Sequence, residues 1–160
     1  MKLQELIENV QQWSKDRGLD KADSKKQLLK LYEEFGELAA GIAKGNQEVI
    51  EDSIGDVVVV LIILAQQQGI TELNDIRYQI HGDDMMHNVA ICISFISKAI
   101  LNGYDPHLVA NEIEMIIAGL RLVDKNTIFE DCLEAAWNEI QDRKGKMVDG
   151  VFVKEGDLKK

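Results

Sequence analysis

The sequence predicts an all-α fold, a helical bundle of about five to six helices that ends in a short hairpin or extended arm. Apolar side chains recur at helical spacing along most of the chain. Proline occurs once in 160 residues, and residues that favour helices, such as Leu, Ala, Glu, Lys and Gln, are abundant. The length suits one domain with a buried core, so we expect residues 1–160 to form a single domain.

Capping residues and glycines divide the first part of the chain into three predicted helices. The first covers 3–17 and stops at a glycine. A capping box that begins at Ser24 opens the second helix, which Gly45 ends. Asn46 then opens a third helix. This third helix contains the most apolar stretch of the sequence.

The second half predicts further helices and one small β element. A short polar stretch, 71–80, is expected to be helical and leads to a longer helix over about 85–102. An Asp-Pro pair opens the next helix, which continues to about residue 123. A capping box at Thr127 opens the last helix. Within 147–153 the helical period is lost, and an Asp-Gly pair predicts a hairpin turn.

Charge and hydropathy exclude several classes of protein. A net charge of −10 argues against binding of nucleic acid or of an anionic membrane surface. A small nucleotide is not excluded, because a bound cation and a few basic side chains can reverse the field locally. The longest apolar run, from Val57 to Ala65, is about half as long as a membrane span, and no signal segment precedes it. We therefore expect a cytoplasmic protein.

Acidic residues on two successive helices are the strongest functional signal. Glu34 and Glu37 lie beside the apolar stripe of the second helix, next to small residues that would let another helix approach. Asp52 and Asp56 share one face of the third helix, and this face continues as apolar side chains. Because the following turns are apolar all round, an unpaired carboxylate at Asp56 would be costly.

A bound divalent cation would offset the cost of the unpaired carboxylate at Asp56. Oxygen ligands without Cys or His at matching spacing favour Mg²⁺, or Mn²⁺, over zinc. An alternative stays open at this point. In it, Glu33, Glu34 and Glu37 form a solvated face in which Lys30 pairs with an acid one turn away. That alternative does not explain Asp56.

These residues resemble a known family. The pattern Glu33-Glu34-x-x-Glu37, followed by a Gly-Asp pair that enters an apolar helix, is similar to the acidic motifs of the MazG-like all-α nucleoside triphosphate pyrophosphohydrolases. The resemblance extends over about residues 10–68 and 127–155. Residues 71–125 match no motif and are expected to be extra helices within the same domain. The sequence departs from the family pattern at Ser53, where a glutamate is usual, and at Ile140, where a lysine is frequent.

The resemblance implies a metal-dependent enzyme that cleaves a (d)NTP to (d)NMP and pyrophosphate. It implies Mg²⁺ ligands at Glu34, Glu37 and Asp56. For the acid missing at Ser53 two alternatives stay open: Asp52 is a substitute ligand, or the site has fewer protein ligands and more waters. Glu33 or Asp52 would orient or deprotonate the water. The expected substrate contacts are Lys30, Asn138, Arg143, Lys144, Lys146 and Trp13. All of these except Asn138 have a plainer interpretation: Lys30 pairs with Glu34, the basic cluster complements a helix end, and Trp13 belongs to the core.

Assembly and an alternative function complete the predictions. Burying a helix as apolar as 57–65 needs several neighbours, so we expect a homodimer or homotetramer unless the added helices cover it within the chain. The alternative function is a noncatalytic nucleotide-binding or scaffold protein with a degenerate metal site. The sequence does not identify the base, the sugar, the number of metal ions or the biological role.

Overall fold

The structure is a computed structural model that describes residues 1–77 and 84–158. Its elements in chain order are α1 (Leu3–Asp16), η1 (Leu19–Lys21), α2 (Ser24–Lys44), α3 (Gln47–Gln67), α4 (Met85–Leu101), α5 (Pro106–Leu120), α6 (Phe129–Ile140), β1 (Gly145–Val148), β2 (Val151–Lys154) and η2 (Glu155–Asp157). Six α-helices and a two-stranded antiparallel hairpin in the described residues confirm the predicted fold class.

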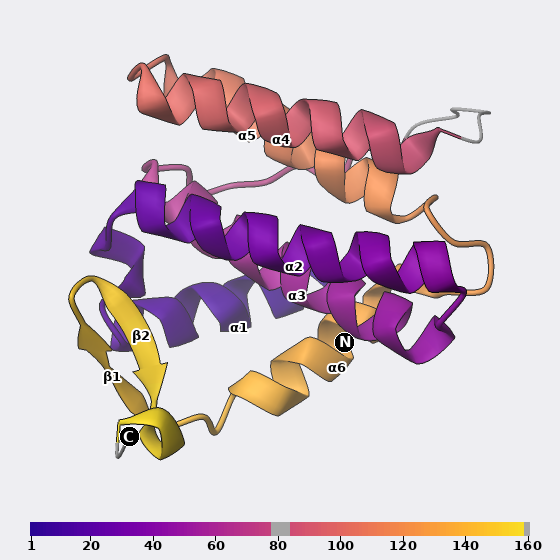
Figure 1. Cartoon of the computed structure of the whole chain (residues 1–160). Helices are drawn as coiled ribbons and strands as arrows, with labels where there is room; N and C mark the ends of the chain where they lie inside the picture. Colours follow the sequence, from indigo (N-terminus) through magenta and orange to yellow (C-terminus); the bar gives the residue numbers. More distant parts are fainter. Residues whose placement is uncertain (78–83, 159–160) are drawn as a thin grey trace.

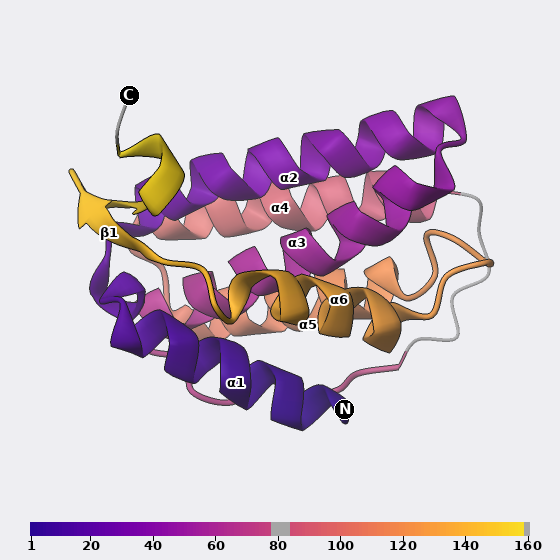
Figure 2. The same ribbon diagram turned by 90° about the horizontal axis from the view of Figure 1, so that it is seen from below.

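Helices α2 and α3 form the centre of the molecule (Figure 1). The α4–α5 pair covers one side of them, and α1, α6 and the β-hairpin lie on the other side, as the second view also shows (Figure 2). Helix α3 contacts α1, α2, α5 and α6, so every residue from Val57 to Ala65 is at most 7% exposed. This chain alone therefore buries the apolar stretch of α3, and that stretch needs no second copy to cover it. No helix in the described ranges is long and apolar enough to cross a membrane.

The helix starts agree with the predicted caps at two places and differ at two. The side chains of Asn46 and Asp105 accept hydrogen bonds from backbone N–H groups of α3 and α5, as predicted. The cap of α2 is Asp23, which accepts from the N–H of residue 25, and Ser24 is already helical. The capping box at Thr127 is wrong, because α6 has no side-chain cap. The Thr127 hydroxyl instead bonds to Asp124.

The segment that follows α3 is not helical where the structure describes it, so the predicted helix over 71–80 is wrong for 71–77, and residues 78–80 lie outside the description. Both the backbone N–H and the side-chain amide of Asn74 donate to one carboxylate oxygen of Glu114, at 2.8 and 2.9 Å. Glu114 is 5% exposed, so its charge depends on these donors. Tertiary hydrogen bonds to α5 thus outweigh the helical tendency of this polar segment.

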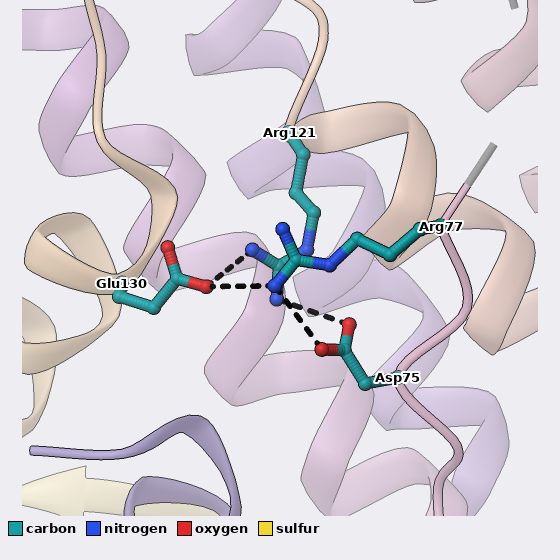
Figure 3. Close-up of polar contacts among 4 residues, drawn as sticks. All are labelled: Asp75, Arg77, Arg121 and Glu130. Atoms are coloured by element: carbon teal, nitrogen blue, oxygen red, sulfur yellow. Dashed lines mark hydrogen bonds and ion pairs between the residues drawn. The ribbon is translucent and has the colours of Figure 1, made fainter. Parts of the chain in front are cut away.

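A second set of polar contacts ties this segment to the ends of α5 and α6 (Figure 3). The guanidinium of Arg121, 8% exposed, pairs with Asp75 at 3.2 Å and with Glu130, and its Cζ lies 4.3 Å from the ring centroid of Phe129. Arg77 joins the same two carboxylates, at 3.2 and 3.6 Å, from a mostly exposed position. Burial acts to raise the pKa of Glu130, but the hydrogen bond and charge of Arg121 outweigh it and hold the pKa below its usual range.

Replacing Arg121 by Ala should lower the free energy of unfolding by about 2–3 kcal/mol, because two carboxylates lose their buried partner. Arg77→Ala is the matched control on the same carboxylates. It should cost less than about 1 kcal/mol, because exposed ion pairs contribute little. Urea unfolding followed by circular dichroism measures both. Equal losses in the two variants would contradict the role assigned to Arg121.

Glycines show where the helices approach one another. A Cβ at Gly55 of α3 would lie 2.3 Å from the carbonyl oxygen of Cys132 and 2.8 Å from the Cβ of Ala136, so α3 and α6 are in backbone contact here. Gly41 of α2 similarly lies against the start of α3. The approach predicted beside Glu34 and Glu37 does not occur at Gly36, where a Cβ would meet nothing within 4 Å.

Candidate functional site

One pocket of about 240 Å³ collects residues from most of the elements on the α1–α6 side of the molecule. Its wall is made by α1, η1, α2, α3, α6 and both ends of β2. The volume is near the lower end of small-molecule sites. Three kinds of side chain share the pocket: carboxylates, basic groups and an apolar and aromatic set.

Three helices each supply one carboxylate to the pocket. Glu34 comes from α2, Asp56 from α3 and Glu139 from α6. Glu34 is 6% exposed, and Asp56 is half-buried at the point where α3 enters the core. Asp52 and Glu37, also predicted as metal ligands, are exposed and do not line the pocket. The structure therefore brings two of the four predicted ligands together in the pocket.

The negative charges of these residues act on one another. Burial, together with the charges of Glu34 and Asp52, raises the pKa of Asp56 to about 7. The pKa of Glu37 is raised by burial and then by Glu34, and the pKa of Asp52 by burial and then by Glu139. Asp52 and Glu37 lie outside the pocket wall, but their charges interact with those of the pocket acids. A strongly negative centre is thus formed by five acids: Glu34, Glu37, Asp52, Asp56 and Glu139.

Lys30 makes the ion pair that the solvated-face alternative predicts. Its ammonium lies 2.7 Å from Glu34 and 3.4 Å from Glu33. Glu33 is exposed and does not line the pocket. The near-complete burial of Glu34, however, is not expected of a solvated face. Lys30 thus neutralises one buried carboxylate, while Asp56 keeps its raised pKa.

Four basic side chains line the pocket beside the acids: Lys26, Lys30, Arg143 and Lys154. Of the predicted substrate contacts, only Lys30, Arg143 and Trp13 are among the lining residues. The side chains of Lys144 and Lys146 are exposed and outside the pocket wall. Asn138 also lies outside it, and its side-chain oxygen accepts a hydrogen bond from Gln141 at 3.2 Å.

The acidic centre fits a divalent cation in its chemistry. Glu34 and Asp56 offer hard oxygen ligands, and a cation would offset the repulsion that raises the pKa of Asp56. In residues 1–77 and 84–158, no three His, Cys, Asp or Glu side chains form a group that could hold a metal ion in the arrangement found. Ser53, where the family pattern has a glutamate, is 1% exposed and does not line the pocket.

Trp13 lies in the core and at the pocket wall, and its role as a substrate contact stays a prediction. It is 6% exposed, as a core residue is, and it lines the pocket. Its ring makes an edge contact with Phe152, with centroids 5.6 Å apart, and the Cζ of Arg17 lies 4.3 Å from its centroid. Its indole nitrogen is buried and has no hydrogen-bond partner among the residues that the structure describes. The aromatic part of the pocket therefore begins in the core.

Sequence reasoning missed several pocket residues, namely Lys26, Glu139, Phe152 and Lys154. Three of them lie in α6 or the hairpin, more than 70 residues beyond α3, so only tertiary packing brings them to the acids. Lys26 lies eight positions before Glu34 on the same helix, and its helical phase is the one local signal that the sequence held for any of them.

Comparison with known proteins agrees with the acidic motifs. Residues 22–80 match the model of the MazG nucleotide pyrophosphohydrolase domain. This confirms the predicted resemblance for residues 22–68, whereas the resemblance predicted for 127–155 lies outside the match. A protein of Haemophilus phage HP1 (strain HP1c1), described as an uncharacterized 18.2 kDa protein in the rep-hol intergenic region, is 54% identical over 69 residues. That alignment covers 42% of this chain and 42% of the phage protein. No solved structure matches the chain.

Proposed function

Because residues 22–80 match the MazG nucleotide pyrophosphohydrolase domain, we propose that the protein is a metal-dependent pyrophosphohydrolase that converts a (d)NTP to (d)NMP and pyrophosphate. One observation carries the proposal. A buried and a half-buried carboxylate of the matched segment, Glu34 and Asp56, share a pocket with four basic side chains. A triphosphate with a divalent cation needs both signs of charge in one site.

In this proposal each group has a distinct task. Glu34 and Asp56 would hold Mg²⁺ or Mn²⁺, with Glu37 and Asp52 as further acids at the edge of the site. The bound cation supplies charge neutralisation at the phosphates and lowers the pKa of a bound water. Arg143 offers a planar, bidentate donor to phosphate oxygens.

Two groups would compete for the ammonium of Lys30, the carboxylate of Glu34 and a phosphate oxygen of the substrate. Its 2.7 Å contact with Glu34 leaves it at the pocket wall, where a phosphate oxygen would compete for the same ammonium. The residue that orients or deprotonates the attacking water is either Glu33 or Asp52, both of which lie exposed beside the pocket. Both therefore remain candidates for this proton transfer.

The test is pyrophosphate release from a panel of dNTPs and NTPs with Mg²⁺ or Mn²⁺. Wild type should release pyrophosphate from at least one nucleotide. Glu37→Gln should lower the rate at least about tenfold, because it removes an acid from the metal field. Glu8→Gln, an exposed change on α1, is the control and should leave the rate unchanged. A wild type that cleaves no nucleotide would refute the proposal.

A noncatalytic nucleotide-binding protein is the second candidate. Two observations favour it: Ser53 replaces an expected acid, and the part of the chain that the structure describes contains no ready-made metal group. This candidate predicts that nucleotides bind and raise the melting temperature without turnover. The release assay and a thermal-shift assay with the same nucleotides therefore distinguish the two functions.

We also retain the homodimer or homotetramer as a proposal. Exposed apolar side chains on α4, such as Ile91 at 58% and Phe95 at 59%, are compatible with an interface. Light scattering at micromolar concentration measures the state directly. A monomer would support the alternative in which helices of the same chain provide all the cover that α3 needs.

A further inference from the structure

Strand β2 lies outside the matched segment, yet it forms one wall of the pocket. Phe152 and Lys154 both line it. Residues two apart on a strand point to the same face, so one face of β2 presents an aromatic ring and an ammonium about 7 Å apart along the strand. No motif in the sequence assigns either residue a role.

The part of the pocket wall that α3 forms changes from acidic to apolar along the helix. Asp56 comes first, and the same wall continues as Val59, Val60 and Ile63. Seven residues of helix span about 10 Å, so the pocket passes from a carboxylate end to an apolar end over that length. Leu19 belongs to the apolar end, because its carbonyl accepts a hydrogen bond from Gln67, one turn beyond Ile63, at 2.9 Å.

Helix α2 runs in the opposite direction and lines the pocket with polar side chains, from Glu34 through Lys30 to Gln27 and Lys26. Glu34 lies at the carboxylate end, and the side chain of Gln27, about two turns earlier, donates to the carbonyl of Val60 at 3.2 Å. Lys26, the neighbour of Gln27, donates to the carbonyl of Asp149 in the hairpin turn. The turn is therefore anchored near the apolar end.

Strand β2 spans the two ends. Near the turn, Phe152 meets Trp13 at 5.6 Å between centroids, and the Cζ of Arg17 lies 5.9 Å from the Phe152 ring. At the other end of the strand, Lys154 pairs with Gly145, two residues after Arg143. The Phe152 ring thus contacts Trp13 and also extends over Gly145, where an added Cβ would lie 2.8 Å from its Cζ, and Lys154 comes from the part of the strand that pairs with the segment following α6.

Backbone contacts hold the hairpin in this position. Asp149 and Gly150 have positive φ values of 50° and 79°, as a two-residue hairpin turn requires. The N–H of Glu155 donates to the carbonyl of Lys144 at 2.9 Å, and the guanidinium of Arg17 donates to the carbonyl of Arg143 at 2.8 Å. Both ends of the hairpin are fastened, so its wall of the pocket is preformed.

We propose that β2 recognises both parts of a nucleotide: Phe152, with Trp13, packs against the base, and Lys154 binds the phosphate chain. This inference rests on the proposed function for the presence of a nucleotide. An apolar and aromatic subsite suits the face of a base, which is apolar, and an ammonium suits a phosphate oxygen. The hairpin is then a specificity element added to the acidic centre of residues 22–80.

The test compares a nucleotide with a phosphate chain that has no base. Calorimetry in the presence of Mg²⁺ measures binding of α,β-methylene-dUTP, α,β-methylene-dATP and inorganic tripolyphosphate. Phe152→Ala should weaken the better-bound nucleotide analogue about tenfold and change tripolyphosphate less than about twofold. Lys154→Gln should weaken both the analogue and tripolyphosphate by about tenfold.

Matched variants separate recognition from folding. Val148→Ala changes the strand opposite Val151, and Lys25→Gln changes the neighbour of Lys26; neither residue lines the pocket, and both variants should bind as wild type does. Phe152→Leu keeps apolar bulk and should show an intermediate loss for the nucleotide analogue alone. If Phe152→Ala does not fold, Phe152→Leu takes its place in the binding measurements.

The outcomes distinguish the two proposals. A wild type that binds neither the analogues nor tripolyphosphate would refute the proposed function. A wild type that binds them, while the Phe152 and Lys154 variants bind equally well, would refute the role of β2 alone. Equal losses for the analogue and tripolyphosphate in the Phe152 variants would also overturn it, because that result means general damage to the pocket.

Discussion

Asp56→Asn should abolish activity and at the same time stabilise the metal-free protein at alkaline pH. The amide keeps the shape of the carboxylate but is a poor ligand for a hard cation, so pyrophosphate release should fall at least about 100-fold. The gain in stability follows from the pKa of Asp56, which is raised to about 7 in the folded state by burial and by Glu34.

The sign of the pH effect is set by that raised pKa. Between the ordinary aspartate pKa of 3.8 and about 7, the folded state binds more protons at this site than the unfolded state. Wild-type stability should therefore fall as pH rises through this window, whereas the amide of the variant cannot ionise and contributes no such loss. Because the site is partly exposed, we expect the free energies of unfolding of the variant and wild type at alkaline pH to differ by about 1–3 kcal/mol. This corresponds to roughly 3–10 °C in melting temperature.

Thermal unfolding in EDTA at pH 4 and pH 8 measures the effect. The two proteins should melt close together at pH 4, and the variant should melt higher at pH 8. Adding Mg²⁺ should raise the melting temperature of wild type more than that of the variant, since only wild type keeps the full ligand set. A variant that is less stable than wild type at pH 8 in EDTA would contradict the charge assigned to this site.

Gly55→Ala should be the most destabilising of the small changes considered. The added methyl would lie 2.3 Å from the carbonyl oxygen of Cys132, so α6 must move away from α3. Overpacking of this kind costs roughly 1–3 kcal/mol, and contact with backbone places this site at about 3 kcal/mol or more. The melting temperature should fall by roughly 10 °C. Activity should fall as well, because α6 carries Glu139 and leads to Arg143.

Gly36→Ala is the matched control. Nothing lies within 4 Å of a Cβ at this exposed position of α2, so the change should add about 0.5–1 kcal/mol through helix propensity alone. Denaturant unfolding of the two variants gives the comparison. If Gly55→Ala were as stable as Gly36→Ala, the close contact of α3 and α6 would be wrong.

Local signals predicted the helices and the hairpin well, because caps and periodicity act within a few residues. Asn46 and Asp105 cap the helices they were predicted to cap, and the Asp149-Gly150 turn forms as expected. The errors came from tertiary contacts. Glu114 holds 71–77 out of a helix through Asn74, and the Thr127 hydroxyl accepts from Gln47 of α3 while it bonds to Asp124 in its own loop.

The candidate site was predictable only in part, for the same reason. Helical phase placed Glu34 and Asp56 on facing helices, and both line the pocket. Helical phase could not show that α6 and β2 approach the pocket. Glu139 and Lys154 were therefore missed, whereas Lys146, which lies outside the pocket wall, was predicted as a substrate contact. Basic residues near a helix end look alike in sequence, and only packing decides which of them face a cavity.

The most direct test of the proposed reaction is ³¹P NMR of a dNTP incubated with the wild-type protein and Mg²⁺. The proposal predicts that the triphosphate signals are replaced by those of pyrophosphate and a nucleoside monophosphate. The conversion should stop when EDTA is added and resume with excess Mg²⁺. Formation of a nucleoside diphosphate and orthophosphate, or cleavage that continues in EDTA, would contradict the account.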